Sequence, residues 1–194
     1  MKLLFVSILS VLSSFIAVAQ NQPHGIAENQ KAPDFTAKDQ NGKMISLKAA
    51  LKKGPVVVVF YRGQWCPYCN RELKMLEDSL SFFQAKGATV IAVTPEIQKN
   101  IEKTIEKTKA TYSILYDDGL SIMKSYDVAF TLDSSMIGKF KGYGIDLNES
   151  NGANGNNLPV PAVYVINKEG MIVYRHFDPD YTKRATVKEI LSHL

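Results

Sequence analysis

The sequence has few of the residues that build metal sites and catalytic triads. Its 194 residues include two cysteines, three histidines and one tryptophan. The histidines, His24, His176 and His193, are scattered and match no catalytic signature. A structural zinc site takes four ligands, commonly from Cys and His, and here only Cys66 and Cys69 stand at a suitable spacing. We therefore expect no metal and no other cofactor.

The chain also lacks a strong excess of charge of either sign. It has 23 Lys and Arg against 19 Asp and Glu, and these charges are interspersed along the sequence. No basic stripe is present, so the composition does not favour a nucleic-acid partner. There are no internal repeats.

One long apolar run stands at the start, in residues 1–19. It follows a single basic residue, Lys2, and ends in Ala17-Val18-Ala19, the small-X-small pattern of a signal peptidase site. A membrane-spanning helix needs about 20 apolar residues, whereas polar Gln20-Asn21-Gln22 follows here without a basic cluster. We predict a signal peptide over 1–19 and an exported, periplasmic domain over 20–194. No cysteine stands at the cleavage site, so we expect no membrane anchor after cleavage.

The two cysteines lie together in the segment YRGQWCPYCN, residues 61–70. As a structural disulfide, Cys66–Cys69 would close a very short loop, worth roughly 2 kcal/mol against about 4.7 for a 100-residue loop. As half of a zinc site, the pair lacks further ligands. A redox centre that opens and closes is therefore the favoured interpretation.

The residues around the pair predict a strand followed by a helix. Residues 55–61, PVVVVFY, form the short β-branched run of a buried strand. Pro67 suits the first position of a helix, and Lys86-Gly87 suits its end. Between them, apolar residues recur at three- and four-residue spacing: Leu73, Leu76, Leu80 and Phe83. Cys66 is thus expected at the helix N-terminus, with Cys69 one turn inside.

This placement assigns the two sulfurs different roles. Backbone N–H groups and the helix dipole favour an exposed Cys66 thiolate, but the dipole alone lowers a thiol pKa by only about 0.2–1.5 units. Further activation needs a hydrogen bond from the Cys69 thiol or a cation, for which Arg62 is the candidate. The alternative for Arg62 is a solvated charge at the end of the strand. We expect Cys66 to attack and Cys69 to resolve the product as a disulfide.

The rest of the chain alternates between strands and helices, which predicts an α/β fold. Expected strands are 88–93 and 112–116, expected helices are 96–110, 120–126 and 186–194, and 162–167 with 171–176 should form a hairpin. Residues 21–55 suggest a small hairpin packed on the sheet. Residues 127–159 are less regular, and 148–157, NESNGANGNN, are expected to form a flexible loop that borders the redox site.

Several motifs resemble known families. A WCxxC between a strand and a helix, with a distant X-Pro that opens a hairpin and a helix, resembles the thioredoxin superfamily. The segment APDFTAKDQNGKMISL resembles the start of peroxiredoxins of the alkyl hydroperoxide reductase/thiol-specific antioxidant type. FYRGQWCPYCNRELKML and LPVPAVYVINKEGMIVYRHFDPDYTKRA are similar to a peroxiredoxin-like branch that has a CPYC motif. The likeness covers nearly all of 31–194.

The resemblance implies a thioredoxin-like fold, with a central mixed sheet flanked by helices and with a peroxiredoxin-like N-terminal extension and insertion. It also implies a cis Val160–Pro161 peptide opposite the cysteines, with the Val160 backbone pairing with an extended substrate. An ordinary trans proline at a strand start is the alternative. Trp65 and Tyr68 would flank the sulfur as an apolar docking rim, and simple packing is the alternative for both.

The sequence also departs from the peroxiredoxin pattern. Peroxiredoxins usually place Pro seven residues, and Thr or Ser three residues, before the attacking cysteine, and these positions are Val59 and Gly63 here. Their peroxide-polarising Arg would align near Pro161. A peroxidase built on this sequence would have to use another donor, for which Arg62 is the candidate.

Two redox functions therefore remain open. The whole-chain resemblance favours a peroxiredoxin-like antioxidant peroxidase, in which a hydroperoxide oxidises Cys66 to sulfenic acid, Cys69 condenses with it and a thioredoxin-type protein reduces the disulfide. The local site favours a thiol–disulfide oxidoreductase that acts on protein disulfides, similar to the thioredoxin-like proteins of cytochrome maturation. An inactive binding module is disfavoured because both sulfurs are present.

Overall fold

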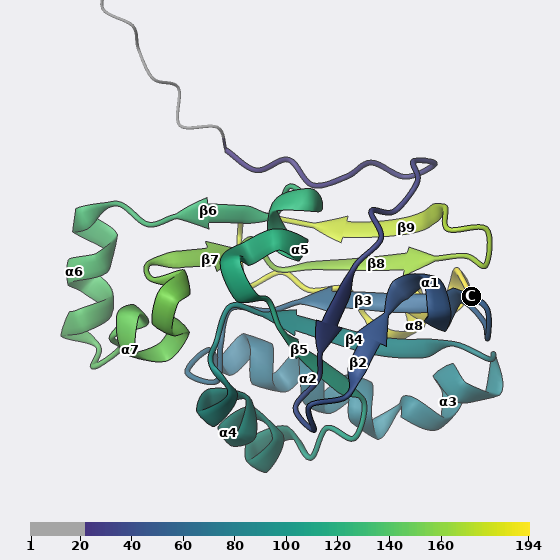
Figure 1. The fold of residues 1–194 in the computed structure, drawn as a ribbon, viewed down its shortest axis with the longest axis horizontal. Helices are drawn as coiled ribbons and strands as arrows, with labels where there is room; N and C mark the ends of the chain where they lie inside the picture. The colour runs from purple at the N-terminus through teal and green to yellow at the C-terminus, as the bar shows by residue number, and fades with distance from the viewer. Residues whose placement is uncertain (1–21) are drawn as a thin grey trace, which may run out of the picture.

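The computed structural model describes residues 22–194, and the signal peptide expected over 1–19 lies outside this range. A five-stranded sheet with the order β5-β4-β3-β8-β9 forms its centre (Figure 1). The strands are β3 (Val56–Phe60), β4 (Thr89–Thr94), β5 (Ser113–Tyr116), β8 (Ala162–Ile166) and β9 (Ile172–Phe177). β3 pairs with β4, and β4 with β5, in parallel, whereas β8 is antiparallel to both β3 and β9. The predicted central mixed sheet is confirmed.

Helices cover both faces of this sheet, which explains why the β3 sequence VVVVF is apolar throughout. Val57 and Val59 face a core shared with α2 (Pro67–Asp78), α3 (Leu80–Ala85), α4 (Gln98–Thr108) and α8 (Val187–Ser192). Val56, Val58 and Phe60 face a second core shared with α1 (Leu47–Leu51) and α5 (Ser121–Ser125). Cys66 and Cys69 belong to the first core.

The N-terminal extension forms the predicted hairpin, with one element that the sequence did not suggest. β1 (Thr36–Lys38) pairs antiparallel with β2 (Met44–Ser46). The short helix α1 follows directly, and the Ser46 hydroxyl accepts a hydrogen bond from the Ala49 N–H at its start. Leu47 is buried under this end of the sheet.

The single helix predicted over 67–86 is in fact two. α2 ends at Asp78 and α3 begins at Leu80, because Ser79 leaves the helical conformation with φ −106° and ψ 5°. The spacing of apolar residues does not reveal this break, because Phe83 of α3 is fully buried in the same core as the α2 residues and so continues their pattern. Among the described residues, no helix is both long and apolar enough to cross a membrane.

The flexible loop predicted over 148–157 is wrong. This part of the chain belongs to an insertion beside the main sheet, which Figure 1 shows as the green lobe at the left. The insertion contains β6 (Ala129–Thr131), α6 (Ser134–Gly142), α7 (Leu147–Asn151), the 3-10 turn Gly152–Asn154 and β7 (Asn157–Pro159). β6 and β7 pair antiparallel.

Buried amides hold this asparagine-rich segment in place. The Asn154 side chain donates to the carbonyls of Pro95 and Asp117, both at 2.9 Å, and accepts from the Gly119 N–H at 3.1 Å. Composition indicated a solvated loop, because it does not show that these amides find backbone partners across the fold.

We expect Asn154→Ala to lower the free energy of unfolding by about 2–3 kcal/mol, because it leaves buried backbone groups without partners. Urea unfolding measures the change. Asn156→Ala is the matched control, because no hydrogen bond of the Asn156 side chain is recorded among the described residues, and it should shift stability by less than about 0.5 kcal/mol. Equal losses in the two variants would contradict this role for Asn154.

Candidate active site

Both cysteines lie where the sequence placed them, at the junction of β3 and α2. Cys66 is the N-cap of α2, Pro67 takes the first helical position, and the Cys69 N–H donates to the Cys66 sulfur at 3.4 Å. Both cysteines are free and 0% exposed. The expectation of an exposed Cys66 is therefore wrong, because the side chains that follow β3 fold over the sulfur instead of pointing into solvent.

Three donors converge on the Cys66 sulfur. The Cys69 sulfur lies 2.6 Å away, Nη2 of Arg62 lies 3.4 Å away, and the Cys69 N–H is the third donor. The hydrogen bond from the Cys69 thiol, followed by the charge of Arg62, lowers the pKa of Cys66 to about 5 although burial acts in the opposite direction. Burial, reinforced by Cys66, raises the pKa of Cys69. Cys66 is therefore the thiolate at neutral pH, and Cys69 is the thiol.

Arg62 is buried against the site and is not a solvated charge. Its guanidinium carbon lies 5.1 Å from the Trp65 ring centroid and 3.8 Å from that of Tyr181. Its Nε is buried without a hydrogen-bond partner among the described residues. Tyr181 comes from the connection between β9 and α8, and no signal in the sequence pointed to it.

Gly63 and Glu96 meet beside the cysteine pair. A Cβ at Gly63 would lie 2.6 Å from Nε1 of Trp65 and 2.7 Å from Oε1 of Glu96, so the Thr or Ser of the peroxiredoxin pattern does not fit here. Oε2 of Glu96 accepts the Gln64 N–H at 2.7 Å. Glu96 is fully buried, and burial raises its pKa to about 8. The predicted helix 96–110 begins two residues later than expected, at Gln98.

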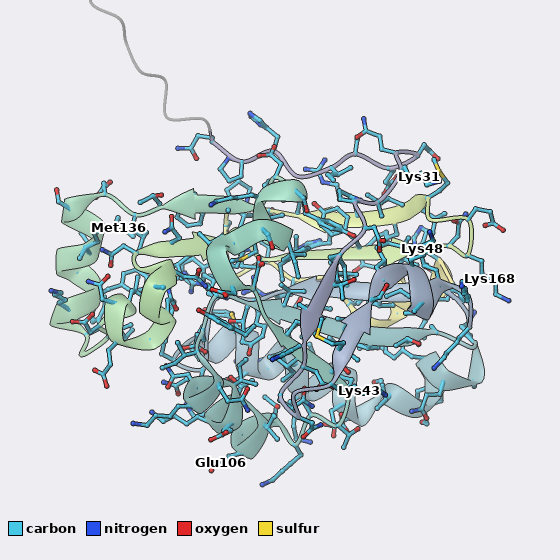
Figure 2. All side chains as sticks on the ribbon, in the orientation of Figure 1. Lys31, Lys43, Lys48, Glu106, Met136 and Lys168 are labelled. Atoms are coloured by element: carbon cyan, nitrogen blue, oxygen red, sulfur yellow. The ribbon has the colours of Figure 1, made fainter. Side chains whose placement is uncertain are left out.

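An apolar groove of about 530 Å³ lies beside the cysteines. Residues of the insertion and of the β9–α8 connection line it, and so do six of the site residues predicted from the sequence: Arg62, Trp65, Pro67, Tyr68, Val160 and Pro161. The Trp65 ring packs edge-on against Phe140 of α6, with centroids 5.2 Å apart. Figure 2 shows Met136 on the same insertion, at the end of the molecule opposite Lys31 and Lys168. The segment 148–157, which was expected to border the redox site, does not line the groove; other parts of the insertion, such as Phe130, Phe140 and Leu158, do.

The cis peptide that the resemblance implied is not present. The described residues contain no cis peptide bond, so Val160–Pro161 is trans. The Val160 N–H donates to the Val128 carbonyl at 2.8 Å, so this N–H is not free to pair with an extended substrate. The strand β8 begins directly afterwards at Ala162, as expected for a proline at a strand start.

A buried ion pair beside Cys69 was not predicted from the sequence. Nε of Arg184 lies 3.0 Å from Oε2 of Glu72, and Nη2 of Arg184 lies 3.7 Å from the Cys69 sulfur. A signal for Glu72 was available, because a residue three positions after Cys69 lies on the same face of α2. Arg184 is far away in the sequence and gave no such signal. Residues 22–194 contain no group of three or more His, Cys, Asp and Glu side chains placed to bind a metal.

Comparison with known proteins decides the family. Residues 29–175 match the AhpC/TSA family. The chain belongs to this family. It is 30% identical over 170 residues to the chloroplastic peroxiredoxin Q of Oryza sativa subsp. japonica, a match that covers 86% of this chain and 68% of that protein. It is 32% identical over 123 residues to the peroxiredoxin Q of Suaeda salsa, covering 63% and 56% respectively. The chain thus spans little more than half of this second relative.

Solved structures of the same fold include peroxiredoxins. Peroxidoxin BcpB from Mycobacterium tuberculosis superposes with a TM-score of 0.66 at 18% identity, covering 86% of this chain and 94% of that chain. The thioredoxin domain of a thiol-disulfide oxidoreductase from Bacteroides vulgatus gives a TM-score of 0.55 at 22% identity, covering 81% and 93%. At these identities the likeness establishes the thioredoxin-like fold alone.

We expect Arg62→Met to raise the pKa of Cys66 by about one to three units, because it removes both a positive charge and a donor from the sulfur. The pH dependence of Cys66 alkylation, followed by peptide mass spectrometry, measures the change. Arg71→Met is the matched control: Arg71 is exposed and lies over the Tyr68 ring, so its loss should leave the pKa in place. An unchanged profile in Arg62→Met would contradict the assignment.

We expect Glu96→Gln to stabilise the protein at alkaline pH. The folded carboxyl keeps its proton to about pH 8, whereas the unfolded one loses it near 4.5, so this group makes the free energy of unfolding fall as pH rises through that window. The glutamine variant removes this contribution. Urea denaturation measures the free energy of unfolding of both proteins. We expect equal values for the variant and wild type at pH 4 and a higher value for the variant at pH 9. A lower value for the variant at pH 9 would refute the assignment.

Proposed function

We propose that this chain is a thiol-dependent peroxidase of the peroxiredoxin type, with Cys66 as the attacking residue and Cys69 as the resolving residue. The observation that supports this most is the convergence of three donors on one buried sulfur. A thiolate is the nucleophile in such chemistry, and a thiol with a pKa of about 5 is ionised at neutral pH.

The reaction divides into two steps. The Cys66 thiolate attacks the nearer oxygen of a hydroperoxide, the O–O bond breaks, and the departing alkoxide takes up a proton to leave as the alcohol. Cys66 is then a sulfenic acid. Cys69 next gives up its proton and its sulfur attacks the Cys66 sulfur, the S–O bond breaks, the hydroxide takes up that proton and leaves as water, and the two sulfurs form a disulfide. A thioredoxin-type protein restores both thiols by disulfide exchange.

Arg62 replaces the family donors that this sequence lacks. Its guanidinium contacts the attacking sulfur and has a further N–H, at Nε, without a partner in the described residues. Such a donor can hold an oxygen of the bound hydroperoxide as negative charge moves onto the leaving oxygen. The guanidinium also contacts the rings of Trp65 and Tyr181, and these cation–π contacts help to hold it at the site.

Access to the sulfur favours a small reactant over a protein disulfide. Cys66 and Cys69 are both 0% exposed, so any reactant requires a covering side chain to move. A hydroperoxide needs a smaller opening of the reduced site than a folded partner does, whereas the thioredoxin-type reductant meets the site only after the disulfide has formed. A partner peptide would also find the Val160 N–H already bonded to Val128. Thiol–disulfide exchange with proteins is therefore the second candidate function.

The groove supports an organic hydroperoxide as substrate. Its walls include Phe130, Leu132, Phe140 and Leu158, which offer apolar surface to an alkyl or aryl group. Hydrogen peroxide has no apolar group to fill this space. We expect kcat/KM for cumene hydroperoxide to exceed that for hydrogen peroxide.

Export is part of the proposal, and the pattern of residues 1–19 supports it. The mature protein should begin at Gln20 in the periplasm, where disulfide chemistry is permitted. Mass spectrometry of protein from a periplasmic fraction would identify the first residue, and an intact N-terminus in the cytoplasmic fraction alone would refute export.

The deciding experiment compares peroxide and disulfide chemistry on the reduced protein. Trp65 is the only tryptophan in the chain and lies at the site, so its fluorescence reports oxidation. We expect peroxide to oxidise the protein orders of magnitude faster than a free thiol at equal thiolate fraction. Slow oxidation together with fast reduction of insulin disulfides would establish the second candidate instead.

Cysteine variants assign the two roles. Cys66→Ser should abolish peroxide consumption, because no activated sulfur remains. Cys69→Ser should still be oxidised once at Cys66 but should form no intramolecular disulfide, and a dimedone adduct at Cys66 would report the trapped sulfenic acid. If the adduct forms at Cys69 in wild type, the assignment is reversed.

A further inference from the structure

A buried cation lies against the Cys69 sulfur. Arg184 lies in the connection between β9 and α8, and its Nη2 is 3.7 Å from the Cys69 sulfur. Its side chain is 9% exposed, and that of its partner Glu72 is 4% exposed. Burying a guanidinium is costly unless it is paired. Glu72 is the partner of Arg184, and this pair holds a positive charge against the Cys69 thiol.

Cys69 requires help to ionise. Burial is the largest effect that raises the pKa of Cys69, and the neighbouring Cys66 raises it further. The attack on the Cys66 sulfenic acid needs the Cys69 thiolate, since the thiol is a poor nucleophile. The groups that face Cys69 are Cys66, the backbone of Arg62, the Tyr61 hydroxyl and Arg184. Of these, only the Arg184 side chain is a cation.

Glu72 holds this cation in place. Its Oε2 lies 3.0 Å from Nε of the Arg184 guanidinium, Nη1 of Arg184 donates to the Lys183 carbonyl at 2.8 Å, and Nη2 is the group that faces the Cys69 sulfur. Burial raises the pKa of Glu72 to about 7, and Arg184 opposes this shift. The charged groups that face Glu72 are Arg184 and Cys66, and the hydroxyl of Tyr112, the residue before β5, lies nearby.

We propose that Arg184 stabilises the Cys69 thiolate in the resolving step and that Glu72 is the positioning residue for its guanidinium. The proposal rests on the proposed function for the sulfenic acid that Cys69 attacks. In that step Cys69 loses its proton, its sulfur forms a bond to the Cys66 sulfur, and the S–O bond breaks. The released hydroxide takes up the proton and leaves as water.

The first test does not depend on peroxide. In a Cys66→Ser background the single remaining thiol is Cys69, so its alkylation by iodoacetamide between pH 7 and 10 reports its ionisation. Adding Arg184→Met should slow alkylation about tenfold at a given pH, because an adjacent opposite charge shifts a pKa by about one unit or more. Lys183→Met is the matched control: Lys183 lies next in sequence and pairs with Asp178 at the surface, 3.2 Å away. Equal alkylation rates with and without Arg184 would overturn the proposal.

The second test separates the two steps in a protein with both cysteines. After mixing with peroxide, the first fluorescence phase should depend on peroxide concentration and the second should not. Arg184→Met should slow the second phase about tenfold, shift its pH profile to higher pH, and leave the first phase within twofold of wild type. Equal slowing of both phases would overturn a specific role at Cys69.

A double variant separates the loss of the Arg184 charge from damage to the fold. Arg184→Met alone leaves Glu72 buried without its partner, whereas Glu72→Gln with Arg184→Met removes both charges together. The double variant should keep the slow second phase, and wild-type rates in it would overturn the proposal. If wild type shows no peroxide-dependent phase, the peroxidase function fails, while the alkylation test still decides the role of Arg184.

Discussion

The hydrogen bonds to the Cys66 sulfur are the interaction on which the rest of the site depends. They exist because residues 61–66 lead from the end of β3 to α2 and place Cys66 at the N-cap, where its sulfur faces the unpaired N–H groups of the first helical turn. The Cys69 thiol, one turn inside the helix, then points at the same sulfur. Each donor is modest in isolation, but burial makes it stronger, because water does not compete for the thiolate. The same burial keeps Cys69 protonated, so one environment separates the two pKa values.

This arrangement buries charged groups, which is unfavourable, and each buried guanidinium has favourable contacts nearby. Arg62 is placed against a thiolate and two aromatic rings, and Arg184 is placed against Glu72. Glu96 lies in the same layer, and its raised pKa makes it neutral at pH 7. The site thus holds two guanidiniums against the Cys66 thiolate and Glu72, whose pKa of about 7 leaves it partly protonated at neutral pH. Such a site depends on close packing around every charged group.

The insertion and the β9–α8 connection turn a cysteine pair into an enclosed site. The insertion supplies one wall of the groove and packs Phe140 against Trp65. The β9–α8 connection contributes Tyr181, whose ring contacts Arg62, and Arg184, whose guanidinium contacts the Cys69 sulfur. Because Gly63 leaves room for Trp65 and Glu96, the donor that peroxiredoxins place at this position is absent, and Arg62 approaches the sulfur from the end of β3 instead. The departures from the family pattern are therefore connected to one another.

Local sequence determined the elements that hold the cysteines. The run VVVVF, Pro67 and the spaced leucines were enough to predict β3, the start of α2 and the positions of Cys66 and Cys69 along these elements, because strand and helix formation depend on near neighbours. Tertiary structure alone decided the rest. The burial of Cys66, the order of the 148–157 segment, the trans Val160–Pro161 bond and the contact of Arg184 with Cys69 each depend on groups distant in sequence. A spacing pattern cannot encode which distant backbone carbonyl an asparagine will find, or which sulfur an arginine will reach, because those partners are set by packing.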